Sequence, residues 1–348
     1  MATNFSIEDA DLTSTSTRIQ SLWVEGFVGY DNAGAAAKLH LGYLSNPAGV
    51  GNILVLKVDG QIQGTLGIHP RAMYCGIRQV RAVAFADFMV SRKHRSIQPA
   101  LMLMKHAAIN MASSFDLVYG APNLRAAPIF LMAGFNCIGN RRRFAKPIAS
   151  APHVLNYLPH WAARLCAPAA DLALELVDRV RSLKIGPQLS FKNGAWDDTV
   201  LDKIWAQRPK GCMFSNRSSH MLHWRFGATG RASWLLSLAY ANDSTVQGYV
   251  VWRQDKGLVE IGDFFCIDTL KRTGALILAF TRWIKHGRVG ATSITLEFFG
   301  NPVVVEQLKS AGMLMRPQIN PLFVGKDTPS NLSDPAQWFF TSFDSDTD

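Results

Sequence analysis

The chain has 348 residues, and at roughly 150 residues per domain this length suggests two domains. Apolar residues make up 48% and charged residues 18%, which is typical of a chain with a hydrophobic core and excludes an intrinsically disordered protein. The formal net charge of +10 favours anionic partners, namely phosphorylated cofactors, nucleic acids or anionic membrane surfaces.

The five cysteines form no C-x-x-C pair, which indicates reduced thiols in a cytoplasmic protein. The nine histidines show no metal-ligand spacing such as H-x-x-x-H, so we expect no metal site. The first ten residues lack the basic and apolar regions of a secretory signal. No uncharged apolar stretch is long enough to predict a transmembrane helix.

The first 150 residues predict two helices, an antiparallel meander and then alternating helices and strands. Asp59-Gly60 lies between two apolar runs and is a strong hairpin signal. Pro99 suits the first turn of a helix, and Gly134 ends another. The predicted helices are 14–27, 33–43, 99–112 and 124–133; the predicted strands are 53–58, 61–68, 80–90, 115–119 and one that follows the basic tract 141–143.

An apolar stretch from Val154 to Leu183 is interrupted by prolines and charged residues. We interpret residues 151–190 as a linker whose helices pack on the domains. The alternative is an interfacial membrane helix, with Trp161 and the arginines at the lipid headgroups.

From about Phe191 the order of elements recurs. The predicted segments are a helix at 218–226, strands at 234–240, 246–253 and 258–267, a helix at 270–286, a strand at 293–298 and a helix at 303–311. The tail at 327–348 is polar and acidic up to Trp338, and we expect it to be loosely ordered.

Three short patterns occur twice, about 180 residues apart. They are Gln63-Gly64 and Gln247-Gly248, Asp87-Phe88 and Asp263-Phe264, and Gly134-Phe135 and Gly312-Met313. Two copies are too few for a solenoid, so we expect a duplicated domain in which each half closes its own core. The predicted fold is α/β (α+β), with domains at 1–150 and 191–326, each a mixed, mostly antiparallel central sheet flanked by helices.

The segment 87–101 is the sharpest functional candidate. An apolar strand leads through a basic turn, 91–98, directly into the N-terminus of a helix. Unpaired N–H groups and the helix dipole bind anions there, and Arg95 adds charge suited to a phosphate. The alternative is a solvated basic loop that only caps the sheet.

These elements and residues resemble the GNAT superfamily of acyl-CoA-dependent N-acyltransferases over 45–147 and 191–325. The family's pyrophosphate loop, [Q/R]-x-x-G-x-[G/A], is matched by Arg95 and Ala100, with Gln98 in place of the first glycine. Asn123 and the Gly134-Phe135 pair match later landmarks of the family. The resemblance implies acetyl-CoA or a longer acyl-CoA as co-substrate, held by Phe88, Met89, Val90, Arg95, Ser96, Ile97, Gln98, Ala100, Asn123 and Phe130.

Two departures from the family pattern concern chemistry. Gln98 replaces a glycine where the backbone approaches phosphate. Phe130 stands where the family has a tyrosine that protonates the departing thiolate, and phenylalanine has no proton to donate. The second half keeps one loop glycine, Gly274, so we expect it to shape the acceptor site and not to bind CoA.

Three residues are candidates for proton transfer. Asp87 is the carboxylate nearest to the expected acyl-CoA residues Phe88–Val90 and is a candidate general base, although the matching Asp263 favours an architectural role. His69 is a rival base, and a lone histidine is more often a surface or core residue. Tyr119 is a candidate proton donor whose alternative is a packed sheet tyrosine.

The leading hypothesis is a cytoplasmic N-acyltransferase that moves an acyl group from acyl-CoA to a small-molecule amine. The stretch 220–226 and the ending 338–346 resemble bacterial acyltransferases of envelope and exopolysaccharide gene clusters, which implies an amino sugar acceptor in polysaccharide biosynthesis. The alternatives are an aminoacyl-tRNA-dependent transferase that modifies peptidoglycan, and a non-catalytic GNAT-derived binding module. The sequence disfavours nucleic acid as a partner, permits peripheral membrane contact and leaves monomer or dimer open.

Overall fold

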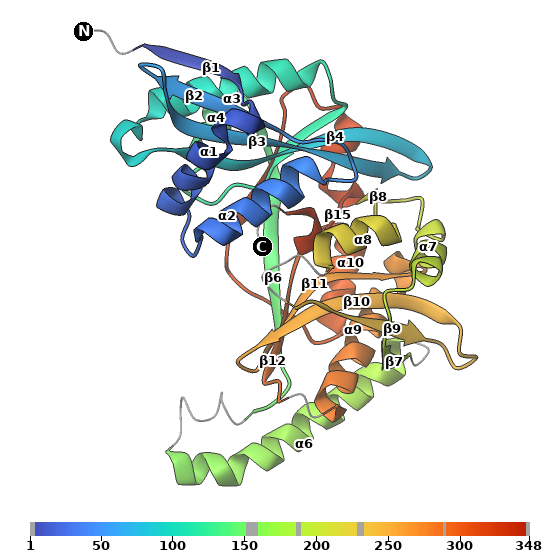
Figure 1. The fold of residues 1–348 in the computed structure, drawn as a ribbon. Coiled ribbons are helices and arrows are strands. Elements are labelled where there is room, and N and C mark those ends of the chain that lie inside the picture. Colours follow the sequence, from blue (N-terminus) through green and yellow to red (C-terminus); the bar gives the residue numbers. More distant parts are fainter. Residues whose placement is uncertain (1–3, 151–158, 186–188, 228–232, 288–289, 346–348) are drawn as a thin grey trace.

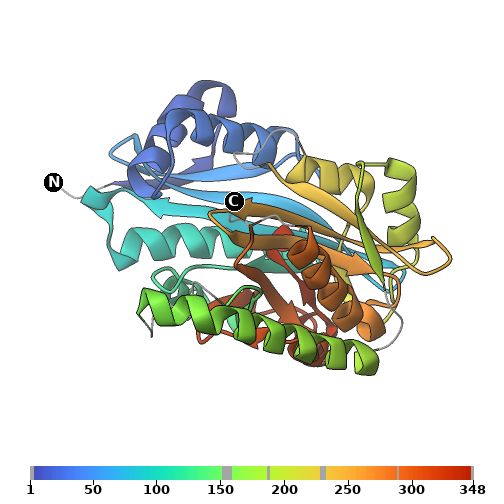
Figure 2. The same cartoon turned by 90° about the horizontal axis from the view of Figure 1, so that it is seen from below.

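The computed structural model describes residues 4–150, 159–185, 189–227, 233–287 and 290–345. In this part a single mixed sheet of 15 strands runs through the molecule, in the order β1-β2-β3-β4-β5-β14-β6-β12-β11-β10-β9-β7, with β8, β13 and β15 paired beside it. Helices cover both faces of the sheet (Figures 1 and 2). The predicted mixed α/β class is confirmed.

The first half contains the predicted helices and meander. Its strands are β1 (Phe5–Asp9), β2 (Asn52–Val58), β3 (Gln61–Cys75), β4 (Arg78–Val90), β5 (Leu117–Gly120) and β6 (Asn136–Pro147). Its helices are α1 (Leu12–Gly26), α2 (Asn32–Leu39), a π-helical turn η1 (His40–Leu44), a 3₁₀ turn η2 (Arg92–His94), α3 (Ile97–Ala112) and α4 (Ala127–Met132).

The second half repeats this order. Its strands are β7 (Ser190–Asn193), β8 (Met213–Ser215), β9 (Leu235–Tyr240), β10 (Val246–Asp255), β11 (Leu258–Cys266), β12 (Ser293–Gly300), β13 (Leu314–Met315), β14 (Asn320–Val324) and β15 (Phe339–Phe340). Its helices are α6 (His160–Ile185), α7 (Asp198–Ala206), α8 (Ser219–Phe226), α9 (Thr269–His286), α10 (Pro302–Ser310) and α11 (Ser330–Ser333), with 3₁₀ turns η3 (Pro335–Gln337) and η4 (Ser342–Asp344).

Strand β2 is apolar along its length because both of its faces are covered. Ile53 and Val55 pack in one cluster with α1 and α2, whereas Leu54 and Leu56 pack on the opposite face with α3. Successive side chains of a strand point to opposite faces, so a strand covered on both sides is continuously apolar. Each such side chain stabilises the fold by about 1.5–3 kcal/mol through burial.

The two halves exchange strands, which differs from the expectation that each closes its own core. Strand β14, late in the chain, pairs with β5, while β6 of the first half pairs with β12 of the second. Phe323 of β14 therefore lies in the first-half core, and Phe144 of β6 lies in the second-half core. Figure 1 shows β6 running between the two halves.

The C-terminal tail is part of the core, and the expectation of a loosely ordered tail is wrong for its described residues. Trp338, Phe340 and Phe343 are almost fully buried. Strand β15 pairs with β12, and Trp338 and Phe340 join a cluster that also contains Met73 and Tyr119 of the first half. The aromatic residues at 338–340 are the sequence signal for this burial.

Candidate active site

Strands β4 and β5 run parallel and then separate. Their pairing covers Ala82–Phe85 and Leu117–Gly120, after which β5 ends and β4 continues to Val90. Residues 86–90 of β4 thus have a paired edge toward β3 and an edge toward β5 that no strand of the described chain covers.

A bulge lies in β4 where the strands separate. Thr65 pairs with Met89 and Gly67 with Ala86, so two residues, Asp87 and Phe88, face one residue of β3. Asp87 has a φ of 50°, in the left-handed region that Asp tolerates better than most residues. Such a bulge turns the Asp87 side chain and bends the end of the strand.

The backbone of Val90 faces the uncovered edge. The N–H of Ser91 donates to the carbonyl of Gln63 in β3 at 2.7 Å. Because N–H groups alternate between the two edges of a strand, the N–H of Val90 points the other way, toward β5. The Val90 carbonyl on that side accepts from Arg95 Nε at 3.3 Å.

The basic turn leads into the N-terminus of α3, as the sequence predicted. Ser96 is the residue before the helix, and its side chain makes no capping hydrogen bond. The first-turn N–H groups of Ile97 and Gln98 therefore have no acceptor from the cap, while Pro99 has no N–H at all. The cations Arg92, Lys93 and Arg95 are exposed around this helix end.

The side chain of Asp87 lies on the opposite face, in a buried polar cluster under α1, α2 and η1. Lys38 Nζ lies 2.8 Å from Asp87 Oδ1, and Tyr43 Oη donates to Asp87 Oδ2 at 2.6 Å. His69 Nε2 approaches Asp87 Oδ2 to 3.5 Å. Thr65 donates to the Asp87 carbonyl at 3.0 Å, which fixes the backbone of the bulge.

The cluster fixes the protonation of both titratable candidates. Burial alone raises the pKa of Asp87, but the Lys38 ammonium and His69 outweigh it and hold the pKa well below its usual range. Burial lowers the pKa of His69 below the ordinary 6.5, and Asp87 offsets this only in part. At neutral pH the pair is an ionised carboxylate beside a neutral imidazole.

The three candidates for proton transfer share one face of the sheet. His69 pairs with Ala84 of β4, and Ala84 pairs with Tyr119 of β5, so His69 and Tyr119 flank a small residue in one row. Side chains in one row point to the same face. Strand β3 continues past His69 to Cys75, beyond the end predicted at residue 68.

Tyr119 meets the C-terminal segment. Its hydroxyl donates to the carbonyl of Asp344 at 3.4 Å, and its ring packs against Trp338 and Phe340. The structure thus brings Asp87 and His69 together and places Tyr119 on the other side of Ala84 from His69.

The remaining candidates divide into exposed and buried residues. Ser96, Ile97 and Gln98 are exposed beside Arg95, and Phe88 is half-buried. Met89, Val90, Ala100 and Phe130 are buried, and Phe130 stacks on Phe323 in the core. Asn123 is exposed, and its side chain accepts from the N–H groups of Arg125 and Ala126 just before α4.

In the second half the corresponding divergence is occupied by the chain itself. Strands β11 and β12 pair from Leu258–Ile261 to Ser293–Leu296 and then separate. Strand β15 pairs with β12 at Phe299 and Gly300, and the turn η4 contacts β11. The C-terminal segment therefore fills the gap between β11 and β12, which corresponds to the uncovered edge of β4 in the first half.

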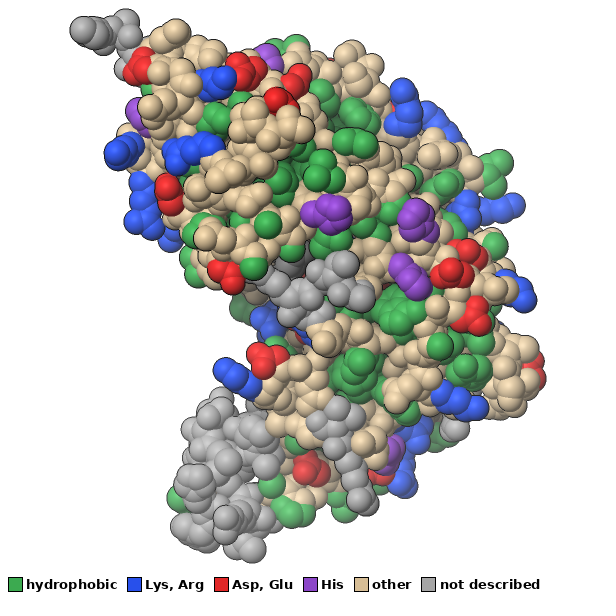
Figure 3. Space-filling view, in the orientation of Figure 1, with side chains coloured by type: hydrophobic (Ala, Val, Ile, Leu, Met, Phe, Trp, Pro, Cys, Tyr) green, Lys and Arg blue, Asp and Glu red, His purple; other side chains and the backbone are tan. Residues whose placement is uncertain are grey.

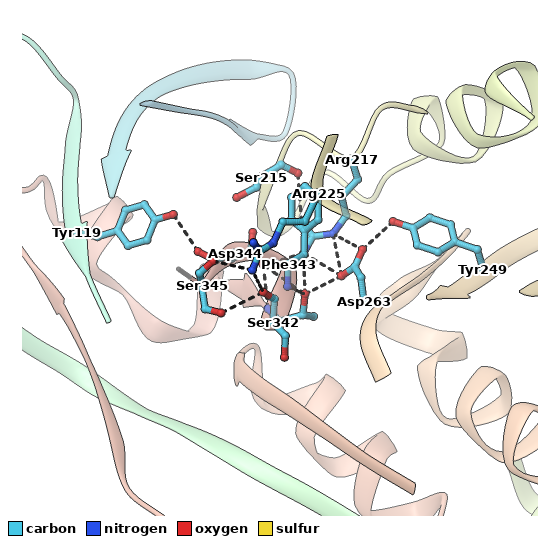
Figure 4. A network of polar contacts seen from close by, with 11 residues as sticks. Tyr119, Ser215, Arg217, Arg225, Tyr249, Asp263, Ser342, Phe343, Asp344 and Ser345 are labelled. Atoms are coloured by element: carbon cyan, nitrogen blue, oxygen red, sulfur yellow. Dashed lines mark hydrogen bonds and ion pairs between the residues drawn. The ribbon is translucent and has the colours of Figure 1, made fainter. Parts of the chain in front are cut away.

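A fully buried arginine holds this segment in place (Figure 4). Arg217 Nε donates to Asp263 Oδ2 at 3.1 Å, and Arg217 Nη2 donates to Asp344 Oδ2 at 2.8 Å. Thr341 donates to Asp263, and Tyr249 donates to the same carboxylate. Burial raises the pKa of Asp263, and although Arg217 opposes this, the second carboxylate at Asp344 raises it further.

Sequence reasoning missed several residues of these two clusters. Lys38 and Tyr43 belong to helices whose spacing gives no hint of a partner in β4. Arg217 and Asp344 are separated by more than a hundred residues, and their pairing depends on the position of the tail. The repeated Asp87 and Asp263 were the one available signal.

The stretch 220–226 connects other parts of the molecule. Trp224 Nε1 donates to the carbonyl of Leu41 in η1 at 2.8 Å. Arg225 Nη2 donates to the carbonyls of Ser342 and Ser345. Phe226 packs against Trp234 and Phe343. These contacts join the second half to the first-half helices and to the tail.

Among the described residues no group of three or more His, Cys, Asp or Glu side chains is placed to hold a metal ion. The cysteines are free thiols. Burial raises the pKa of Cys212 to about 11 and that of Cys266 to about 12, so both thiols are protonated at neutral pH. Within the described part, no helix combines the length and apolar character needed to cross a bilayer.

No protein-family model and no curated protein sequence matches the chain. Solved structures do match. A GCN5-related N-acetyltransferase from Anabaena variabilis ATCC 29413 aligns with a TM-score of 0.62 and 13% identity, over 92% of this chain and 72% of its own. The chain has the GNAT fold.

Two further GNAT-fold structures are similar over nearly the whole chain. A conserved Enterococcus faecalis V583 protein of unknown function has a TM-score of 0.63 and 12% identity, with 93% of this chain and 73% of that chain covered. Saccharomyces cerevisiae N-myristoyltransferase, solved with bound myristoyl-CoA, has a TM-score of 0.53 and 10% identity, with 94% and 80% covered.

Proposed function

We propose that this GNAT-fold chain is a cytoplasmic N-acyltransferase that moves an acyl group from acyl-CoA to an amine. The observation that carries the proposal is the N–H of Val90, which points to the uncovered edge of β4 directly before a cationic turn and an uncapped helix N-terminus. A backbone N–H in this position would polarise the thioester carbonyl and stabilise the charge that develops on its oxygen.

The first turn of α3 fits a pyrophosphate despite the missing glycine. Gln98 lies within the helix and is not among the residues with positive φ, so its backbone conformation does not require glycine. Its side chain is exposed. These N–H groups and Arg95 supply the donors and the charge that a diphosphate needs.

His69 is the better proton acceptor of the Asp87–His69 pair. The Asp87 carboxylate is ion-paired and has a strongly lowered pKa, which makes it a weak base. In the proposed reaction the amine nitrogen bonds to the thioester carbon, the C–S bond breaks, and the amine proton passes to His69. Asp87, 3.5 Å from Nε2, would stabilise the imidazolium. The thiolate would take its proton from solvent, because Phe130 cannot donate one.

The second half would shape the acceptor site and bind no CoA. The C-terminal segment pairs with β12 and contacts β11 where these two strands separate, which is the place that a CoA arm would need, and the Arg217 network holds it there. Trp224 contacts η1, next to the cluster of Asp87. An amino sugar, as in polysaccharide biosynthesis, is the proposed acceptor, and this choice rests on the resemblance of residues 220–226 and 338–346 to envelope acyltransferases.

Two other functions remain as hypotheses to test. An aminoacyl-tRNA-dependent transferase would need a continuous basic track, and on the face in Figure 3 Lys and Arg side chains occur in separate groups. A non-catalytic binding module would bind acyl-CoA without turnover, and Phe130 is the residue that favours it.

Calorimetric titration with a panel of acyl-CoAs tests the proposal, followed by mass spectrometry of products from a mixture of amines. We expect saturable binding of at least one acyl-CoA and weaker binding in Arg95→Glu. The matched control is Arg78→Glu, which makes the same charge change at the far, exposed end of β4. No binding of any CoA ester, or equal effects of the two variants, would refute the pyrophosphate site.

A further inference from the structure

Helix α6 turns its acidic side toward the protein. The carboxylate of Asp171 accepts from the backbone N–H of Ser150 at 2.7 Å. Asp178 pairs with the buried Lys146 at 2.9 Å, and Glu175 lies 4.0 Å from Lys285 at the end of α9. Asp171 and Asp178 therefore attach the helix to the protein body, whereas Glu175 pairs at 2.7 Å with Arg179 of the same helix.

The outward side of the same helix is aliphatic. Its large exposed side chains are Leu172 (59% exposed), Leu176 (52%), Val177 (45%), Val180 (53%) and Leu183 (83%). A surface helix of a globular protein has the opposite arrangement, with its apolar side in the core. Figures 1 and 2 show α6 at the periphery, with no other described element beyond it.

This arrangement indicates a partner. The five side chains extend over twelve residues, or about 18 Å of helix, and a continuous exposed apolar patch marks an interaction surface. On its inner side α6 packs on the protein, where Ala167 is buried; residues 151–158 and 186–188 of the proposed linker lie outside the described residues. This packing leaves the outer side unexplained.

The charges beside the patch select the kind of partner. Arg179 and Lys184 are the exposed charged residues of the described part of α6 that border the aliphatic side. Both are cations; Glu175 pairs with Arg179, and Asp171 and Asp178 face inward, so the border of the aliphatic side carries an excess of positive charge. A second copy of the chain docked by this surface would bring cations close to cations, whereas an anionic lipid surface is complementary.

We propose that α6 lies flat on an anionic lipid surface. Leu172, Leu176, Val180 and Leu183 insert at the boundary between headgroups and acyl chains, and Arg179 and Lys184 contact lipid phosphates. No described helix can span a bilayer, so attachment is at the interface. The enzyme proposed above would then work beside a membrane, although the attachment does not depend on that activity.

Co-sedimentation of the full chain with vesicles tests this proposal. We expect retention on phosphatidylcholine vesicles that contain phosphatidylglycerol, less retention on pure phosphatidylcholine, and a decrease at high salt. Leu176→Glu and Val180→Glu should each reduce the partition coefficient by about tenfold, since each removes an aliphatic side chain that would be buried in the lipid. Both positions are exposed, so circular dichroism and the melting temperature should stay at the wild-type values.

The matched control is Ile109→Glu, which makes the same change at an isoleucine of α3 that is 73% exposed. It should bind vesicles as the wild type does. The proposal is overturned if the wild-type chain does not bind the anionic vesicles, or if Ile109→Glu and Leu176→Glu weaken binding equally. It is also overturned if the chain fails to bind vesicles but forms a dimer that Leu176→Glu dissociates, which would assign the patch to a second copy.

Discussion

Asp87 and Asp263 occupy matching places in the two halves, yet their carboxyl groups have opposite pKa shifts. Asp87 faces the ammonium of Lys38 and the imidazole of His69, and its pKa is lowered. Asp263 shares a single guanidinium, that of Arg217, with Asp344, and its pKa is raised. The matching positions thus have a single carboxylate next to His69 in one half and a structural pair of carboxylates in the other.

Removing the cation beside Asp87 should destabilise the folded protein. Lys38→Met leaves a buried carboxylate without its ion pair, and we expect the free energy of unfolding to fall by about 3–5 kcal/mol. Chemical denaturation at pH 7 measures this change. Lys57→Met is the matched control, because Lys57 pairs with Glu8 at a more exposed site and should lose about 0–1 kcal/mol. Equal losses in the two variants would show that the Asp87 cluster is solvated.

Arg217→Met should destabilise the protein in a pH-dependent way. The substitution leaves Asp263 and Asp344 buried with no cation between them, so their pKa values in the folded variant rise above those in the unfolded chain. A group with a raised folded pKa stabilises the fold only while it is protonated. The variant should therefore lose progressively more stability relative to the wild type as the pH rises from about 4 to 8.

Urea denaturation of wild type and Arg217→Met at several pH values checks this expectation. Arg253→Met serves as the control, since Arg253 forms a more exposed pair with Glu260. A stability difference that does not change with pH would contradict the buried network.

Trp338→Ala tests whether the tail is structural. Trp338 is fully buried, and its Nε1 donates to the carbonyl of Leu332 at 2.9 Å. We expect a loss of about 3–5 kcal/mol, the usual cost of truncating a large buried aromatic side chain. Leu314→Ala, at a position 55% exposed, should change the stability by less than about 0.5 kcal/mol. A small effect of Trp338→Ala would restore the expectation of a loosely ordered tail.

Local signals in the sequence predicted most of the elements. The Asp59-Gly60 turn between apolar runs marked the hairpin of β2 and β3, and Pro99 marked the first turn of α3. The strand exchange was not predictable, because the pairing of β14 with β5 depends on contacts between residues that are distant in the chain. The same limit applies to the site. The basic turn before α3 is contiguous in sequence, whereas Lys38 reaches Asp87 only through the packing of α2 on the sheet.

The partnership of His69 and Asp87 predicts distinct kinetic effects. If His69 accepts the amine proton, His69→Gln should lower kcat by about 10²–10⁴-fold and leave the KM for acyl-CoA unchanged. Because burial lowers the pKa of His69 below 6.5, the imidazole stays neutral at pH 6.5, and the acid limb of kcat/KM should lie below that pH.

Asp87→Asn should retain the KM but shift the acid limb to still lower pH, since the loss of the carboxylate removes the group that raises the pKa of His69. Steady-state kinetics from pH 5 to 9, with circular dichroism of each variant, provide the measurement. A kcat for His69→Gln within about threefold of the wild type would exclude His69 as the base, and the same result for Asp87→Asn would exclude an essential role for Asp87.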